Sequence, residues 1–155
     1  SVFMLDVLHH LPKPQLFLSE LERCLKPGAK ALLVEPASTP FSRFIYKNFH
    51  HESFDEKMPG WEFGHDSHLA AANQALPHII FERDRALLEK NFPRLSLLKI
   101  KKHTFVSYPA SGGLAYEPLL PATLWPLVEL AELAAAPFYG LLGLHMDIYL
   151  EKKKA

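Results

Sequence analysis

The first 36 residues constrain the fold more than any other part of the chain. Residues 2–5 and 29–34 are short apolar runs, and between them apolar residues recur at helical spacing over residues 13–25. A strand, a helix of about three turns and a second apolar strand form one βαβ unit, whose strands lie parallel and adjacent. The sequence therefore predicts an α/β sheet, with any ligand site at the carboxyl ends of these strands.

The junction between this helix and the second strand is a sharp turn. Lys26-Pro27-Gly28 combines a proline, which fixes one turn dihedral, with a glycine, which adopts the positive φ of a type II turn. The single cysteine, Cys24, falls in the apolar helical pattern, so we expect it to be buried and unreactive. One cysteine excludes a disulfide within the chain, which is compatible with a reducing cytoplasm.

The remainder of the chain predicts a lid, a helix and two late strands. Residues 37–76 mix aromatic, histidine and acidic residues without a clean period, which indicates a loop-rich lid with one short helix at 42–49. Residues 76–92 predict a second long helix. Residues 95–108 and 145–151 predict strands, which we expect to form an antiparallel pair at one edge of the sheet.

An unusually apolar segment spans residues 119–144. It predicts a core helix or a cap over the sheet. Alternatively, Trp125, Phe138 and Tyr139 line an apolar channel or rest on a membrane surface that presents a lipid-linked substrate. Its longest uncharged run, residues 133–144, is shorter than the roughly 20 residues of a spanning helix, so we expect no membrane span.

Length and charge limit the number of domains and the classes of partner. The 155 residues predict one globular unit, divided into a strand-helix-strand core (1–36), a lid (37–76), and helices with edge strands (77–155). The 17 basic residues balance 17 acidic residues, so no overall field attracts nucleic acid or an anionic membrane. We therefore expect no nucleic-acid partner.

The βαβ unit resembles a known family in the polar residues that follow its strands. The resemblance covers some 36 residues, and it is carried by Asp6-Val7-Leu8-His9-His10-Leu11-Pro12, Glu22-Arg23-Cys24-Leu25-Lys26-Pro27-Gly28 and Ala31-Leu32-Leu33-Val34-Glu35-Pro36. This pattern is similar to the fourth strand, fourth helix and fifth strand of class I S-adenosylmethionine-dependent methyltransferases. Ala29 departs from it, since the family more often has a second glycine there.

The resemblance implies an α/β fold that is the C-terminal half of a doubly wound, Rossmann-like methyltransferase sheet. It also implies S-adenosylmethionine as the cofactor. The family's glycine-rich loop and ribose-binding carboxylate lie upstream and have no counterpart among the seven glycines of this chain. We therefore expect the gene product to begin upstream and these residues alone to bind the cofactor weakly. A bare strand edge at residues 2–5 would then invite self-association.

Later segments resemble a bacterial subgroup of these enzymes that is often encoded near genes for surface polysaccharide assembly. The segments that carry this second resemblance are Phe41-Ser42-Arg43-Phe44-Ile45-Tyr46, His50-His51-Glu52-Ser53-Phe54-Asp55, Trp61-Glu62-Phe63, Asn73-Gln74-Ala75-Leu76-Pro77 and Phe81-Glu82-Arg83-Asp84. It implies methylation of an oxygen or nitrogen on a small or glycan-like acceptor.

The candidate site residues come from three parts of the chain. The resemblance assigns Leu5, Asp6, Val7 and His9 to the cofactor. We expect His9, His10 and Glu35 to be catalytic, because a histidine with a near-neutral pKa can take the acceptor's proton. We expect His50, His51, Glu52 and Trp61 to contact the substrate.

Structural alternatives stand beside these roles. Asp6 would cap the following turn, one histidine would pack beneath the helix, and Glu35 would pair with a backbone amide of the lid.

Two other classes of function remain open. One is a non-catalytic remnant or binding module, and the other is a metal-dependent hydrolase that uses the histidine-rich lid. The lid offers His50, His51, Glu52, Asp55, His65, Asp66 and His68. Their spacing matches no zinc signature, including H-E-x-x-H, so we predict no metal site.

Overall fold

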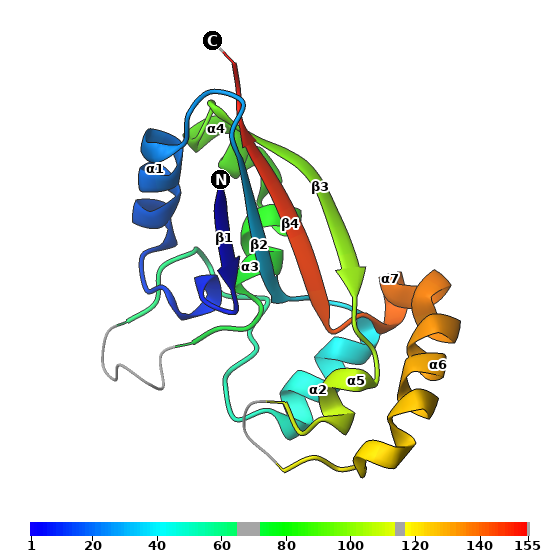
Figure 1. The fold of residues 1–155 in the computed structure, drawn as a ribbon. Coiled ribbons are helices and arrows are strands. Elements are labelled where there is room, and N and C mark those ends of the chain that lie inside the picture. Colours follow the sequence, from blue (N-terminus) through cyan, green and yellow to red (C-terminus); the bar gives the residue numbers. More distant parts are fainter. Residues whose placement is uncertain (65–71, 114–116, 155) are drawn as a thin grey trace.

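The computed structural model describes residues 1–64, 72–113 and 117–154, and its centre is a four-stranded mixed sheet in the order β1-β2-β4-β3 (Figure 1). The strands are β1 (Val2–Leu5), β2 (Lys30–Pro36), β3 (Leu95–His103) and β4 (His145–Lys152). Together with the helices, the sheet makes a mixed α/β fold of a kind compatible with a Rossmann-like methyltransferase.

The predicted βαβ unit is confirmed. β1 and β2 pair in parallel, with Val2 opposite Ala31, and α1 (Pro14–Cys24) connects them. Gly28 has φ 77°, and the amide of Ala29 donates to the carbonyl of Lys26 at 2.9 Å, as the predicted turn requires.

The buried face of α1 differs from the expected one. Leu18, Leu21 and the following Leu25 are buried, whereas Cys24 is exposed. The expectation of a buried Cys24 was therefore wrong, because the apolar stripe of this helix passes to one side of it.

The two late strands form the predicted antiparallel pair, with β3 at the edge of the sheet. β4 lies between β3 and β2 and is antiparallel to both. Met146, Ile148 and Leu150 alternate along β4 and are fully buried, which is the period of a strand with one face in the core.

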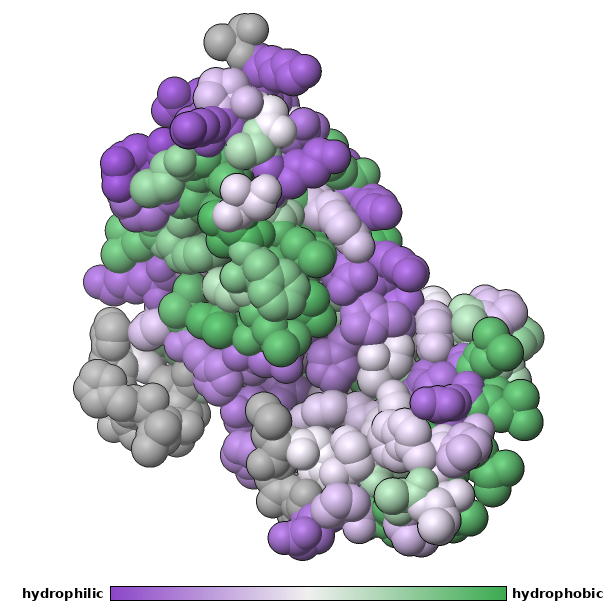
Figure 2. Space-filling model, in the orientation of Figure 1, coloured by the Kyte–Doolittle hydropathy of each residue, from purple (hydrophilic) through white to green (hydrophobic). Residues whose placement is uncertain are grey.

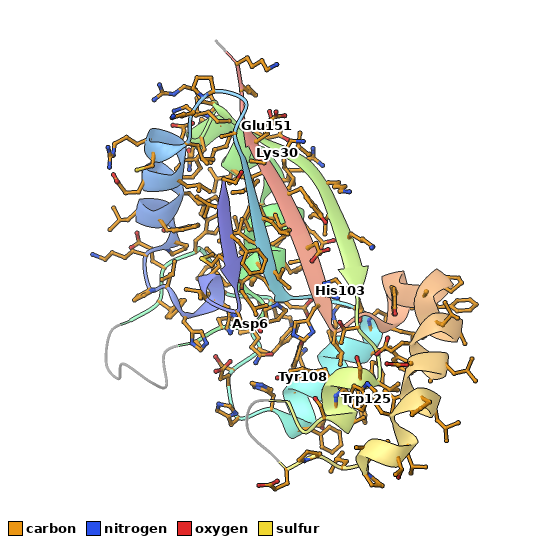
Figure 3. All side chains as sticks on the ribbon, viewed as in Figure 1. Asp6, Lys30, His103, Tyr108, Trp125 and Glu151 are labelled. Carbon is orange, nitrogen blue, oxygen red and sulfur yellow. The ribbon has the colours of Figure 1, made fainter. Side chains whose placement is uncertain are left out.

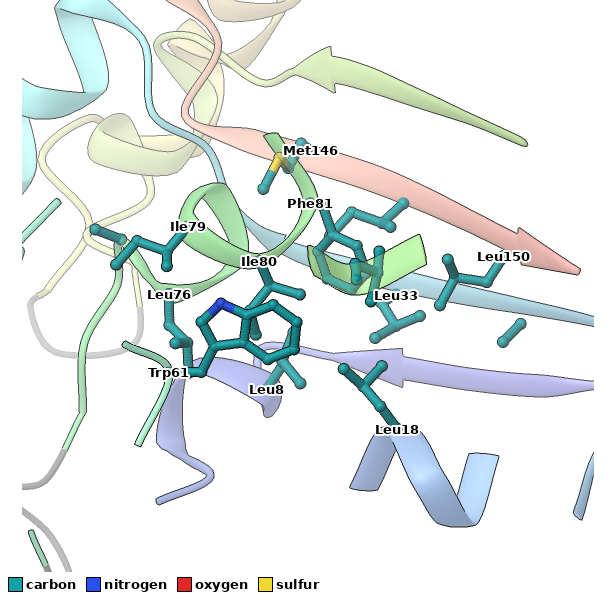
Figure 4. Packing of buried hydrophobic residues seen from close by; sticks show 14 of the residues in the cluster. Leu8, Leu18, Leu33, Trp61, Leu76, Ile79, Ile80, Phe81, Met146 and Leu150 are labelled. Atoms are coloured by element: carbon teal, nitrogen blue, oxygen red, sulfur yellow. The ribbon is translucent and has the colours of Figure 1, made fainter. Parts of the chain in front are cut away.

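The core lies between one face of the sheet and the helices α1, α3 (Leu76–His78) and α4 (Arg85–Asn91), as Figure 4 shows for the central side chains. On the other side of β1, Phe3 and Leu5 are 66% and 53% exposed, and Figure 2 shows an apolar patch where β1 lies. A doubly wound sheet has helices on both faces. Among the described residues, this patch has no such cover.

The predicted helix at 76–92 is interrupted. Between α3 and α4 lies a π-helical turn, Ile79–Arg83, in which the amide of Asp84 donates to the carbonyl of Ile79 at 2.8 Å. Ile79, Ile80 and Phe81 are consecutive and all fully buried. The predicted helical segment is therefore present from Leu76 to Asn91, with one wider turn that accompanies the burial of three successive side chains.

Helix α2 (Pro40–Phe49) confirms the helix predicted in the lid. Thr39 and Ser42 form a reciprocal capping box at its start, with Pro40 in the first turn, which fixes where the helix begins. After α2, the chain runs without regular helix or strand to residue 64. An isolated parallel bridge between Ser53 and Asn73 joins this stretch to the segment that begins at residue 72.

The apolar segment after residue 119 does not form a core helix or a cap over the sheet, so that expectation was wrong. It folds into α6 (Trp125–Ala135) and α7 (Tyr139–Leu142) with short 3-10 turns, Ala122–Leu124 and Ala136–Phe138, and it stands beside the lower end of the sheet with α5 (Ser107–Ala110) (Figure 1).

Most of the large apolar side chains of α6 face solvent. Leu127 and Leu133 are 63% and 72% exposed, and only Val128 and Ala135 of this helix are buried. Glu132 ties α6 to the chain after β3 by accepting from the backbone amides of Phe105 and Ser107. None of the helices in the described part of the chain is long and apolar enough to span a bilayer.

Candidate functional site

Titratable side chains meet at one edge of the sheet. Asp6 and the 3-10 turn Leu8–His10 follow β1, and Glu35 lies at the end of β2. Because β4 runs antiparallel, its first residue, His145, pairs with Pro36 at the same edge. Figure 3 shows Asp6 at the lower end of β1, with Tyr108 below it on the side of α2 and α5.

Glu35 holds this edge together from inside the fold. Its side chain is fully buried, and one carboxylate oxygen accepts from the backbone amides of Val7 at 3.0 Å and Leu8 at 2.7 Å. The other oxygen lies 2.7 Å from Nδ1 of His9. The amides belong to the loop after β1, so the alternative of a pairing with a lid amide was wrong.

His9 lies buried between two carboxylates. Its Nδ1 faces Glu35, and its Nε2 lies 3.5 Å from Oε2 of Glu52. Burial alone would lower the pKa of His9, but hydrogen bonds to Glu35 and Glu52 and their charges raise this pKa from 6.5 to about 9. At neutral pH, the ring therefore carries protons on both nitrogens, and it has no free lone pair with which to act as a general base.

Glu52 is the centre of a ring of imidazoles. Nitrogen atoms of four histidines lie 3.5–4.0 Å from its carboxylate oxygens: His9, His10, His50 and His51. Nε2 of Gln74 donates to the same carboxylate at 2.9 Å. The hydrogen bond to His9 lowers the pKa of Glu52 to about 2, against the opposing effect of burial, so the carboxylate is ionised.

Three histidines of the site are neutral at pH 7. Burial lowers the pKa of His10, and so does the charge of neighbouring His9. Burial likewise lowers the pKa of His50, and it lowers that of His145 to about 4 with help from His103. The side chain of His10 is 43% exposed, so among these three it is the imidazole that a bound molecule reaches most easily.

Asp6 occupies an unusual backbone conformation at the end of β1. Its φ is 50°, in the left-handed region, and its Oδ1 is buried without a hydrogen-bond partner among the described residues. Burial and the charge of Glu35 raise the pKa of Asp6 to about 6. The following 3-10 turn receives no side-chain cap, so the capping alternative for Asp6 was wrong.

These groups line a cavity of about 260 Å³. Its lining residues are Asp6, His9, His10, Pro36, Tyr46, His50, His51, Glu52, Gln74, Tyr108 and His145. The structure thus brings Asp6, His9 and His10 together with the expected substrate residues His50, His51 and Glu52. Glu35 stands directly behind His9.

Other expected site residues lie elsewhere. Trp61 is buried in the core, where its Nε1 donates to Asp84 at 2.9 Å, and it does not line this cavity, so its contact with the substrate stays a prediction. Leu5 lines a separate hollow with Val34 and His103, and Val7 contributes its backbone amide to Glu35. Three lid residues named above, His65, Asp66 and His68, lie outside the described residues.

Sequence reasoning missed several residues of this cavity. His145 had a usable signal, because the first residue of an antiparallel strand lies beside the carboxyl ends of its parallel neighbours. Gln74, Tyr46 and Tyr108 had no comparable signal, since each is far in sequence from the residues that it meets.

Two groups of side chains bring potential metal ligands within 4.8 Å of one another. They are His9, His10 and Glu52, and Asp6, His9 and Glu35. His9 belongs to both, and its two protonated nitrogens face Glu35 and Glu52. Hydrogen bonds therefore account for these arrangements, and the absence of a metal site stays a prediction.

Comparison with known proteins connects this site to one class of enzyme. Residues 1–33 match the family model described as "Methyltransferase domain". The matched part spans β1, α1 and the first half of β2, and it contains Asp6, His9 and His10. It supports a methyltransferase over that segment of the 155 residues. The chain has no match among the curated proteins.

Proposed function

We propose that this chain is the C-terminal half of an S-adenosylmethionine-dependent methyltransferase and that it supplies the acceptor side of the active site. The observation that carries the proposal is the coincidence of two features. In the segment that matches a methyltransferase domain, Asp6, His9 and His10 follow the first strand, and these residues line a cavity of about 260 Å³ rich in titratable groups. The proposed acceptor atom is an oxygen or a nitrogen.

The described residues fit one end of the cofactor. Asp6 presents a buried oxygen that accepts no hydrogen bond from the described residues and lies 3.9 Å from Nε2 of His145, which suits a bound ammonium group. The cavity of about 260 Å³ lies below the roughly 300 Å³ at which pockets for drug-sized ligands begin, and the chain has no G-x-G-x-G loop. We therefore propose that upstream sequence supplies the remaining contacts. When bound, S-adenosylmethionine supplies an electrophilic methyl group.

In this proposal, His10 removes the acceptor's proton. Its ring is neutral and accessible, whereas His9 already carries protons on both nitrogens. Glu52 lies 3.6 Å from Nε2 of His10, where its negative charge would stabilise the imidazolium that forms. Glu35 acts indirectly in this proposal, because it fixes the ring of His9 and the loop that carries His10.

The test uses the full-length protein with S-adenosylmethionine and candidate acceptors. We expect His10→Gln to lower the single-turnover rate by roughly 10²-fold with little change in cofactor affinity. The matched control is His78→Gln, because His78 lies on α3 and does not line the cavity.

Three outcomes would contradict the proposal in different ways. Wild-type turnover by His10→Gln would reject this residue as the base. A full-length protein that neither binds S-adenosylmethionine nor transfers a methyl group would favour the alternative of a non-catalytic binding module. Micromolar cofactor binding by the 155 residues alone would reject the division of the cofactor site.

A further inference from the structure

A second, larger cavity adjoins the candidate site and differs from it in chemistry. Its volume is about 630 Å³, and it is lined by Ile45, Asn48, Phe49, His50, His51, Tyr108, Pro109, Gly112, Gly113 and Leu119. These lining residues include no aspartate, glutamate, lysine or arginine. Its volume falls within the roughly 300–1,000 Å³ of small-molecule sites.

Several polar groups of this lining already have partners. Nδ2 of Asn48 donates to the carbonyl of Phe44 at 2.7 Å, within α2. The amides of Gly112 and Gly113 donate to the carbonyls of Pro109 and Tyr108. A sugar placed here would therefore lose water from its hydroxyl groups and find few new partners, which is unfavourable.

The two cavities adjoin each other at shared residues. His50, His51 and Tyr108 line both of them. The hydroxyl of Tyr108 lies 3.5 Å from Nε2 of His50, at the boundary between the apolar and the titratable side chains. A molecule that occupied both cavities would pass beside this pair, with one end near His10 and Glu52.

We propose that the acceptor is amphipathic, with an uncharged apolar chain in the larger cavity and its methylated heteroatom in the smaller one. This inference rests on the proposed methyl transfer and narrows its acceptor. A glycan-like head group suits it only when an apolar chain is attached. The apolar chain of this acceptor belongs either to a free amphiphile or to a lipid presented by a bilayer.

The first test measures binding of linear alcohols from hexanol to decanol by titration calorimetry, with no cofactor present. We expect the affinity to rise roughly fourfold with each added methylene, because each buried methylene leaves water for an apolar environment. Glucose, as a sugar without a chain, should not compete. An affinity that does not depend on chain length would overturn the inference.

Two substitutions locate the binding. Leu119→Glu places a charge in the cavity and should weaken decanol binding by tenfold or more, with little effect on folding because Leu119 is 71% exposed. Leu127→Glu is the matched control, since Leu127 is exposed on α6 and does not line the cavity. Equal weakening by both variants, or by neither, would overturn the assignment.

A third experiment identifies the source of the acceptor's apolar chain. Phosphatidylcholine vesicles that bind the wild type but not Leu119→Glu would assign it to a bilayer lipid, and binding of free alcohols alone would assign it to a free amphiphile. Binding to neither would overturn the inference. The full-length protein separates the two proposals: alcohol binding without methyl transfer refutes the proposed function, and methyl transfer with chain-length-independent binding refutes the amphipathic acceptor.

Discussion

Replacing Glu35 with glutamine tests whether one buried carboxylate organises the site. The glutamine side chain would keep the size of the original and an oxygen that can accept from the backbone amides of Val7 and Leu8. It would lose the negative charge that faces Nδ1 of His9 at 2.7 Å. The substitution thus separates charge from shape at a fully buried position.

The expected loss of stability follows from these three contacts. A hydrogen bond to a charged acceptor contributes about 1.5–3 kcal/mol and one to a neutral acceptor about 1 kcal/mol, so the two amide bonds lose about 1 kcal/mol each. Removing one partner of a buried ion pair costs about 3–5 kcal/mol, but Glu52 still faces His9 in the variant. We expect a total near 3 kcal/mol, which lowers Tm by roughly 6–12 °C in a chain of this size.

The pH dependence gives a second, independent readout. The pKa of His9 in the folded protein is about 9, above its ordinary value of 6.5. The stability that this shift contributes is therefore complete below pH 6.5 and is lost as the pH rises through 9. Denaturant unfolding should accordingly show a larger difference between wild type and Glu35→Gln at pH 6 than at pH 9.5.

Glu129→Gln is the matched control, because Glu129 is exposed on α6. It should unfold like the wild type at both pH values. Histidine titration by NMR would show directly whether the pKa of His9 falls toward 6.5 in Glu35→Gln. A pKa that stays near 9, or a variant as stable as wild type, would refute the reasoning.

Three further substitutions test other parts of the structure. Leu33→Ala removes a fully buried side chain from the centre of the core and should cost about 2–5 kcal/mol in chemical unfolding; a loss below 1 kcal/mol would contradict the packing. Gly143→Ala would place a Cβ 2.7 Å from the carbonyl of Tyr139, so its Tm should fall by an amount equivalent to about 1–3 kcal/mol, and an unchanged Tm would count against this geometry. His145 has a folded-state pKa of about 4, below its ordinary 6.5, so the wild type should lose stability as the pH falls from 6.5 to 4, and His145→Phe should not; parallel pH profiles would disprove the neutral buried imidazole.

The sequence predicted the βαβ unit and the late strands because each has a strong local signal. Residues 2–5 and 29–34 are apolar runs, and the turn at Gly28 combines a proline with a glycine of positive φ, which is typical of a type II turn. Those signals placed Asp6, His9, His10 and Glu35 at one edge of the sheet. Parallel strands bring their carboxyl ends together whatever the rest of the chain does.

The remaining features depend on contacts between distant residues. The meeting of Glu52 with His9 joins two segments that are far apart in the sequence. The charge state of His9 follows from the two carboxylates beside it, so the residue type alone could not predict it. The exposure of α6 had no local signal either, because an apolar helix on the surface and one in the core have the same composition.

The π-helical turn at Ile79–Arg83 bears on how the length of this segment can change. A π turn holds one residue more than the α-helical turn that it replaces. Deleting one residue from it would restore an α-helical turn, and the residues that follow would keep their direction around the helix axis. Leu88 would then still face the core. A deletion within the regular part of α4 would instead rotate the residues after it by about 100°, so the π turn is the place in this segment where the gene can lose one codon at the lowest cost.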